Sequence, residues 1–194
     1  MTTDPSREED PPVWLLNTVS GIDRYVGRGS GVLFCWLIIP MVGGLTYEVL
    51  SRYLFHAPTI WAYDITYMLY GSHFMLGAAY CLLRGGHIRT DIFYGKWSER
   101  TKGRVDAALY LLLFFPGMFF FLTRGWNEAY HAWDIGERSD LTPFQPIMWP
   151  FKAVVPITAA LLLIQGTSEF LKAFWAARTG KELFPKTDTP AEML

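Results

Sequence analysis

The charged residues of this chain lie in blocks, and long apolar stretches without any charge separate those blocks. A helix needs about 20 mainly apolar residues to cross the hydrocarbon core of a bilayer. Four uncharged stretches approach or reach that length: 29–47, 65–83, 107–123 and 153–168. The last two are short, but charged side chains at their ends can reach toward lipid headgroups, so the helices can exceed their uncharged cores.

We therefore predict an all-α integral membrane fold with four transmembrane helices. The predicted helices cover about residues 29–50, 62–84, 104–125 and 151–177, within a membrane domain of residues 28–178. A soluble helical bundle is the alternative. It is disfavoured because 51% of the 194 residues are hydrophobic, which leaves little polar sequence to cover four apolar helices.

The distribution of lysine and arginine predicts the orientation of these helices. Of the 17 basic residues, 13 lie in the N-terminal segment, in the loop between the second and third helices, and in the C-terminal segment. An even number of crossings places all three segments on one side, and the more basic side is normally cytoplasmic. We expect both termini in the cytoplasm.

Residues 13–27 are predicted to form a separate amphipathic helix on the membrane surface. Four apolar residues recur at spacings of three and four and form a stripe: Leu15, Val19, Ile22 and Val26. Three glycines predict a break before the first membrane helix: Gly27, Gly29 and Gly31. The alternative is that this segment is a simple N-terminal extension of that helix.

The two ends of the chain are polar. Residues 1–12 are predicted to be a tail, and residues 179–194 are predicted to be disordered. The first ten residues hold four acidic side chains and a single arginine, which is unlike a basic leader. We therefore expect the first apolar helix to be a retained anchor.

The loop between the third and fourth predicted helices is the largest segment on the outer side. Its first part places Trp126, Tyr130 and Trp133 at helical spacing, so one face is aromatic. Residues 142–150 then contain three prolines, which favour an extended, stiff backbone. This loop is either a docking surface for a protein or a brace at the membrane interface.

The sequence contains no recognisable catalytic motif. It has no glycine-rich phosphate loop with a lysine, no paired metal ligands at the usual spacing and no nucleophile elbow. We expect neither enzymatic activity nor a cofactor nor a bound metal. The net charge of −1 gives no indication of nucleic-acid binding. Cys35 and Cys81 lie inside apolar stretches and are expected to be packed rather than disulfide-bonded.

One histidine, His73, lies at membrane depth. A haem held by two histidines would need a second one at the same level, so a haem site is disfavoured. We expect His73 to be a hydrogen-bonded packing residue, with Ser72 or Gln165 as candidate partners. At the outer ends of the first two helices, we expect Arg52 and Asp64 to form an ion pair across the short loop. No ladder of carboxylates and no inverted repeat of broken helices is visible, which favours a subunit over a complete transporter.

The segment between the second and third helices carries the most specific pattern. It reads Arg84-Gly85-Gly86-His87-Ile88-Arg89-Thr90-Asp91-Ile92. It resembles the cytoplasmic motif of the small membrane subunit, DctQ type, of tripartite ATP-independent periplasmic (TRAP) transporters, with Thr90 where that family usually has valine. Further similarities are Arg52-Tyr53-Leu54-Phe55, the pair Trp61 and Asp64 (where glutamate is more common), and residues 146–156. The resemblance covers about residues 30–177.

The resemblance implies a function and a set of partners. A DctQ-type subunit pairs with a large membrane subunit, here expected to be a separate chain, that holds the substrate and sodium sites. A periplasmic binding protein delivers an organic acid, and the small subunit enlarges the static scaffold beside an elevator-type transport domain. The location would be the bacterial inner membrane. Two alternatives are a haem- or quinone-linked membrane anchor of a redox enzyme and a small stand-alone homo-oligomeric transporter.

The resemblance also selects seven residues as candidate interface positions. On the inner side, Arg84, His87, Arg89 and Asp91 would fix the loop against helix ends or lipid phosphates. The alternative is that these charges act only as a topology signal. On the outer side, Arg52, Trp61 and Asp64 would shape the scaffold surface near the binding protein.

Overall fold

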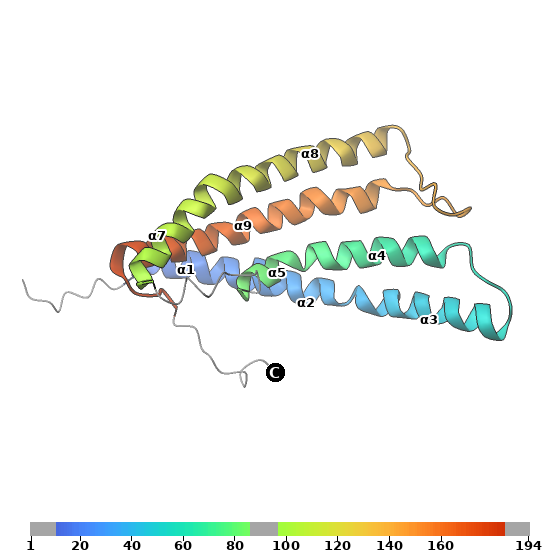
Figure 1. The fold of residues 1–194 in the computed structure, drawn as a ribbon, viewed down its shortest axis with the longest axis horizontal. Coiled ribbons are helices and arrows are strands. Elements are labelled where there is room, and N and C mark those ends of the chain that lie inside the picture. Colours follow the sequence, from blue (N-terminus) through green and yellow to red (C-terminus); the bar gives the residue numbers. More distant parts are fainter. Residues whose placement is uncertain (1–10, 86–96, 185–194) are drawn as a thin grey trace, which may run out of the picture.

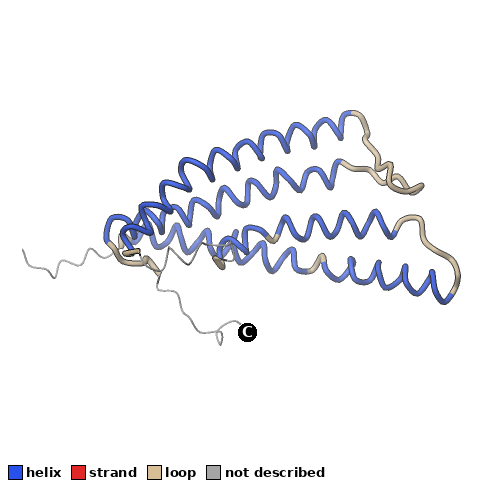
Figure 2. The backbone as a smooth tube through the Cα atoms, viewed as in Figure 1, coloured by secondary structure: helices blue, strands red, loops and turns tan. Residues whose placement is uncertain are grey.

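The computed structural model describes residues 11–85 and 97–184, and these are almost entirely helical (Figure 1, Figure 2). Within those ranges there is no β-strand, and the loop between the last two helices holds an isolated bridge between Arg138 and Ile147. The all-α membrane fold class predicted from the sequence is confirmed.

The first helical rod runs through four consecutive segments. They are α1 (Val13–Ile22), the π-helical η1 (Asp23–Arg28), α2 (Gly29–Cys35) and α3 (Ile38–Leu54). Together they form an apolar helix of 42 residues. The helix continues through Gly27, Gly29 and Gly31, so the structure shows no break there. The separate membrane-surface domain of residues 13–27 stays a prediction.

The glycines of this rod allow close packing of neighbouring helices and do not end the helix. A Cβ atom on Gly27 would lie 2.7 Å from the Cδ2 atom of Leu83, and one on Gly31 would lie 2.6 Å from the Cδ2 atom of Tyr80. Both glycines keep helical geometry, so their small size, and not their conformational freedom, is what the fold uses.

The stripe predicted for α1 packs against the protein. Leu15 and Val19 are buried with Leu183, and Leu171 and Trp175 of the last helix cover them. The stripe therefore does not supply a membrane-facing surface, as a helix lying on the leaflet would require. That the outward face of α1 lies at headgroup level stays a prediction.

The remaining helices are α4 (Ala62–Leu76), α5 (Ala78–Leu83), α7 (Glu99–Leu109), the π-helical η2 (Tyr110–Phe114), α8 (Phe115–Asp134) and α9 (Trp149–Thr179). Three helical rods of the described chain are long and apolar enough to cross a membrane: Val13–Leu54, Glu99–Asp134 and Trp149–Thr179. The second predicted crossing is divided at Gly77 into segments of 15 and 6 residues, so the count of four is not confirmed.

We call the end of the molecule with the loops 55–61 and 135–148 the outer end and the opposite end the inner end. At the outer end the helices form an open layer in the order α8, α9, α4, α3 (Figure 1). Each helix of this row contacts its neighbour, and α3 and α8 lie at opposite edges. Of the most apolar 18 residues in each rod, 39% are buried in α9 and none in the other two rods. Consequently α9 is the centre of the fold, and wide apolar surfaces remain uncovered on both faces of the layer.

The inner end of the layer is more compact because α1 and α7 both pack on the last turns of α9. Ser98 caps the start of α7, where its hydroxyl accepts a hydrogen bond from the Thr101 amide at 3.4 Å. Gly180 ends α9 in a left-handed conformation (φ 77°), and its amide donates to the Ala176 carbonyl at 2.8 Å.

Candidate functional site

Glu48, near the end of α3, ties that helix to the loop that leads into α4. Its Oε1 atom accepts a hydrogen bond from Nε of Arg52 at 2.9 Å, one turn further along the same helix. Its Oε2 atom accepts from the backbone amide of Thr59 at 2.9 Å and also from the Thr59 hydroxyl. The predicted ion pair between Arg52 and Asp64 is therefore wrong, because the nearer carboxylate on the same helix face takes the guanidinium.

Asp64, in the first turn of α4, holds the second outer loop. The residue is 1% exposed. Its Oδ1 atom accepts from the Ser139 hydroxyl at 3.3 Å, and its Oδ2 atom accepts from the Thr142 hydroxyl. A buried carboxylate needs such donors, and the N-terminal end of a helix is itself a favourable place for negative charge. Asp64 thus links the start of α4 to a loop that lies 75 residues further along the chain.

Trp61 lies at the start of α4 and packs across to α3. Its ring stacks on that of Tyr47 with centroids 5.7 Å apart and planes inclined by 28°. The three residues predicted for the outer side therefore lie at one end of the α3–α4 pair. Each of them uses a different partner, and the structure does not bring them into one cluster.

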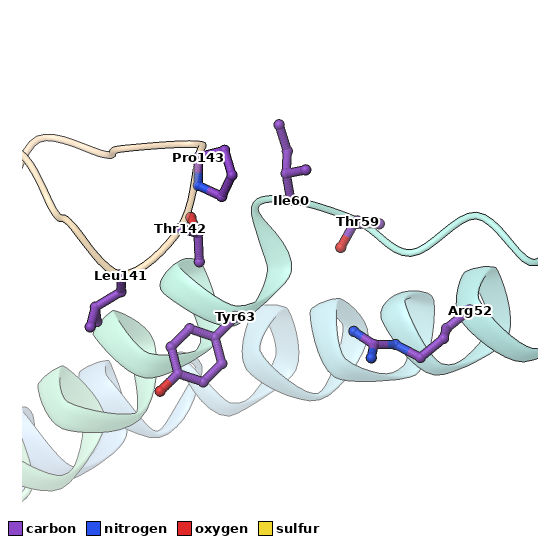
Figure 3. Close-up of a pocket in the computed structure, with 7 residues that line it drawn as sticks. All are labelled: Arg52, Thr59, Ile60, Tyr63, Leu141, Thr142 and Pro143. Carbon is purple, nitrogen blue, oxygen red and sulfur yellow. The ribbon is translucent and has the colours of Figure 1, made fainter.

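An outer pocket of about 420 Å³ opens between the α3–α4 loop and the loop that follows α8. Its lining combines one guanidinium, hydroxyl groups and apolar side chains (Figure 3): Arg52, Thr59, Ile60, Tyr63, Leu141, Thr142 and Pro143. Leu141, Thr142 and Pro143 come from the later loop, which Asp64 fastens in place. Such a surface can take part in recognition by hydrogen bonding and apolar contact.

The loop between α8 and α9 is closed by its own contacts. The Ser139 amide donates to the Pro146 carbonyl and the Met148 amide donates to the Glu137 carbonyl, both at 2.9 Å. Lys152 forms an ion pair with Glu137 at 2.6 Å. The loop is thus anchored on both sides, which suits either of the roles predicted for it.

Of the aromatic residues predicted for one face of that loop, Trp126, Tyr130 and Trp133 are all exposed, at 65%, 64% and 60%. Trp133 also meets Trp149 edge-on with ring centroids 4.9 Å apart. The aromatic face is therefore present on the last turns of α8, and docking and membrane bracing remain alternatives for it.

At the inner end, Arg84 follows the last turn of α5. Its Nε atom donates to the Tyr80 hydroxyl at 3.0 Å, and its guanidinium carbon lies 5.3 Å from the centre of that ring. The other three residues predicted for this side, His87, Arg89 and Asp91, lie outside the described residues. Their roles stay predictions.

A polar cluster that sequence reasoning missed joins η1 to α9. Asp23 accepts hydrogen bonds from Nε2 of Gln165 at 2.9 Å and from the Ser168 hydroxyl at 2.6 Å, and it pairs with Lys172 at 2.7 Å. Gln165 and Ser168 are fully buried. The available signal was the run of polar residues on one side of α9. Asp23 lies off the apolar stripe of residues 13–27, so that stripe gives no indication of this contact.

His73 is a hydrogen-bonded packing residue, as predicted, but neither predicted partner is used. Its Nδ1 atom lies 3.0 Å from the Phe34 carbonyl oxygen, and Gln165 is bound to Asp23 instead. Within residues 11–85 and 97–184 no three histidine, cysteine, aspartate or glutamate side chains come together as a metal site. Cys35 and Cys81 are both free thiols, and both are exposed on the helix layer rather than packed inside it as expected.

A family model described as "Tripartite ATP-independent periplasmic transporters, DctQ component" matches residues 41–175. The chain belongs to the DctQ family. All seven predicted interface residues fall inside the matched region, whereas α1, η1 and α2 precede it. The DctQ chain is accordingly a small permease subunit of a TRAP transporter, and it is a multi-pass membrane protein.

A relative extends the similarity further along the chain. The DctQ chain is 26% identical over 167 residues to the sialic acid TRAP transporter permease protein SiaT of Haemophilus influenzae (strain 86-028NP). That alignment covers 84% of this chain and 25% of the relative, so the chain spans a quarter of the relative's length.

Proposed function

We propose that this chain is the scaffold subunit of a sodium-coupled TRAP transporter that takes up organic acids. In this proposal a large membrane subunit carries the substrate and sodium sites and moves its transport domain as an elevator. A periplasmic binding protein delivers the cargo. The observation that carries the proposal is the family match over residues 41–175.

The open helix layer supports a scaffold role. Within the described residues, two of the three long helical rods bury none of their most apolar 18 residues, and the exposed side chains are aliphatic and aromatic. Lipid covers part of such a surface, and a membrane partner can cover the rest by close packing. We therefore propose that one face of the layer receives the large subunit.

The orientation belongs to the same proposal. The excess of lysine and arginine at one end supports cytoplasmic termini and a periplasmic outer pocket, in the inner membrane of a bacterium. Arg52, Trp61 and Asp64 would then shape the periplasmic surface met by the binding protein. Arg84, His87, Arg89 and Asp91 would fix the cytoplasmic loop.

Reconstitution tests this function. The chain is placed in liposomes with and without the large membrane subunit, and the binding protein and a sodium gradient are supplied in turn. We expect uptake of a labelled organic acid only when all three proteins and the gradient are present. Sialic acid is one cargo to test, since the relative is named for it.

Three results would contradict the proposal. Solute flux driven by this chain alone would favour a stand-alone homo-oligomeric transporter. A haem spectrum or quinone reduction in the purified protein would favour a redox anchor. Omission of the chain with no loss of uptake would remove it from the transporter altogether.

A further inference from the structure

Two antiparallel helical rods carry charges at matching heights. Arg28 and Glu48 are 20 residues apart on the first rod, with no charged residue between them. Asp64 and Arg84 are 20 residues apart on the α4–α5 segment, again with no charge between them. At 1.5 Å per residue this spacing is about 30 Å, which is the thickness of the hydrocarbon core. Arg28 and Arg84 therefore lie at one headgroup level, and the two carboxylates lie at the other.

The two arginines lie at the ends of helical segments that pack against each other. Segments η1 and α2 pack against α5, where Gly27 of η1 faces Leu83 and Gly31 of α2 faces Tyr80. Arg28 stands beside the first of these glycines, and Arg84 follows Leu83 directly. The Tyr80 hydroxyl accepts a hydrogen bond from Arg84, so this guanidinium is held over the same seam.

No acidic side chain of the described residues neutralises this positive charge. Arg24, Arg28 and Arg84 are exposed, and none of them forms an ion pair there. The acidic residue nearest in sequence, Asp23, is directed into the fold, where Lys172, Gln165 and Ser168 occupy it. Within the described residues, the site thus presents guanidinium groups without a carboxylate partner, and guanidinium groups are strong donors to phosphate.

The surface on the membrane side of these arginines is apolar. Along the same rod Val32, Leu33 and Trp36 are exposed at 67%, 66% and 64%. Tyr25, on the other side of Arg28, is 77% exposed, and tyrosine is typical of the headgroup layer. A ligand that fits this surface has an anionic head and long apolar chains.

We infer that the seam between η1 and α5 binds an anionic phospholipid, with its phosphate between Arg28 and Arg84 and its acyl chains along α2. Arg24 adds positive charge one turn away. The assignment of this site to the inner leaflet rests on the proposed orientation. The binding itself does not depend on transport. Failure of this inference would leave the reconstitution result unaffected, and the reverse also holds.

Native mass spectrometry of the detergent-purified chain measures the binding. Dioleoyl phosphatidylglycerol is titrated and compared with dioleoyl phosphatidylcholine. We expect phosphatidylglycerol to bind at least about tenfold more tightly. R28Q should weaken it about fivefold and R28Q/R84Q about 30-fold, since each arginine near an anionic surface contributes about a kcal/mol. The charge-preserving R28K/R84K should stay within about threefold of the unsubstituted chain.

The matched control is R124Q, which removes an exposed arginine near the opposite end of the layer. It should leave phosphatidylglycerol binding unchanged. Equal affinity for the two lipids, full affinity in R28Q/R84Q, or an equal loss in R124Q would overturn the inference. If R28Q/R84Q does not fold, the unsubstituted chain is crosslinked to a photoreactive phosphatidylglycerol and the adducts are mapped. Adducts within residues 24–33 and 80–85 support the site, and adducts confined to other segments refute it.

Discussion

At the scale of single residues, two carboxylates hold parts of the helix layer together: Asp64, which is buried, and Asp23, which is partly buried. Asp64 receives hydroxyl hydrogen bonds from the later outer loop, and Asp23 receives hydrogen bonds and an ion pair from α9. The contacts of Asp64 fix the position of the loop between α8 and α9. The contacts of Asp23 fix η1 against α9. Neither arrangement requires a ligand.

Replacing Asp64 with alanine should release the loop between α8 and α9. Ser139 and Thr142 would lose their charged acceptor, and a hydrogen bond to a charged group contributes about 1.5–3 kcal/mol. Amide hydrogen exchange at residues 139–147 should accelerate about tenfold or more. D140A is the control, because Asp140 is exposed and follows Ser139 directly in the same loop. Unchanged exchange in D64A would show that the prolines alone hold the loop.

Replacing Asp23 with alanine should loosen α1 from α9. Gln165 and Ser168 would lose their acceptor, whereas Lys172 would keep its ion pair with Glu169. The expected cost is about 2 kcal/mol. Thermal unfolding should occur at a lower temperature, and exchange along Val13–Ile22 should accelerate. The exposed Glu182 offers the comparison E182A, which should behave like the unsubstituted chain.

At the scale of helices, glycine is used where two backbones approach each other. A Cβ atom on Gly103 of α7 would lie 2.6 Å from the Ala173 carbonyl oxygen and even closer to the Ala177 amide nitrogen. Backbone atoms cannot move aside as the end of a flexible side chain can. The contact between α7 and α9 therefore depends on the absence of a side chain at this position.

G103A should destabilise the purified chain by about 1–3 kcal/mol, because overpacking of a close contact forces a backbone shift. G117A is the matched control within the same rod, since a Cβ atom there meets nothing within 4 Å. Alanine is the better helix former, so G117A should be neutral or slightly stabilising. Chemical unfolding followed by circular dichroism measures both. Equal stability of G103A and G117A would contradict the packing described here.

The helices themselves were predictable because membrane depth imposes a length on apolar stretches, and the charge blocks at 48–52 and 96–106 mark where those stretches end. Two features of the structure were not predicted from the sequence. A helix can continue through Gly27 and Gly31 when a neighbouring side chain fills the space, and periodicity does not reveal that neighbour. Likewise, Arg52 could be matched with several carboxylates, and the pairing with Glu48 depends on loop geometry that sequence spacing does not encode.

At the scale of the whole molecule, the fold buries little of its apolar surface. Of the described residues, α9 alone among the long rods places a large share of its most apolar part inside. Four candidate interface residues fall in the described part of the chain, Arg52, Trp61, Asp64 and Arg84, and all four lie at helix ends. Of these, Asp64 is buried and Arg52 and Arg84 are exposed. The roles proposed for them rest on the order of motifs in the sequence, and the structure adds the contacts of Arg52, Trp61, Asp64 and Arg84.

This architecture predicts that the isolated chain is less stable than the chain in complex with its large membrane subunit. Binding to the folded state stabilises it by mass action, so co-purification should raise the melting temperature by roughly 5 °C or more. Differential scanning fluorimetry of the intrinsic tryptophan emission can follow unfolding in both samples, with an unrelated membrane protein as the control addition. No change upon complex formation would argue that the layer is complete without a partner.

Because the outer part of the molecule is one helix thick, every side chain of α3, α4, α8 and α9 is within about 10 Å of a boundary with something that is not this chain. In such a single layer of helices, a substitution at almost any position lies close to lipid or to a neighbouring protein. A structural change on one face of the layer needs to cross only one helical diameter to reach the other face. The same helices therefore respond both to the lipid composition and to protein neighbours.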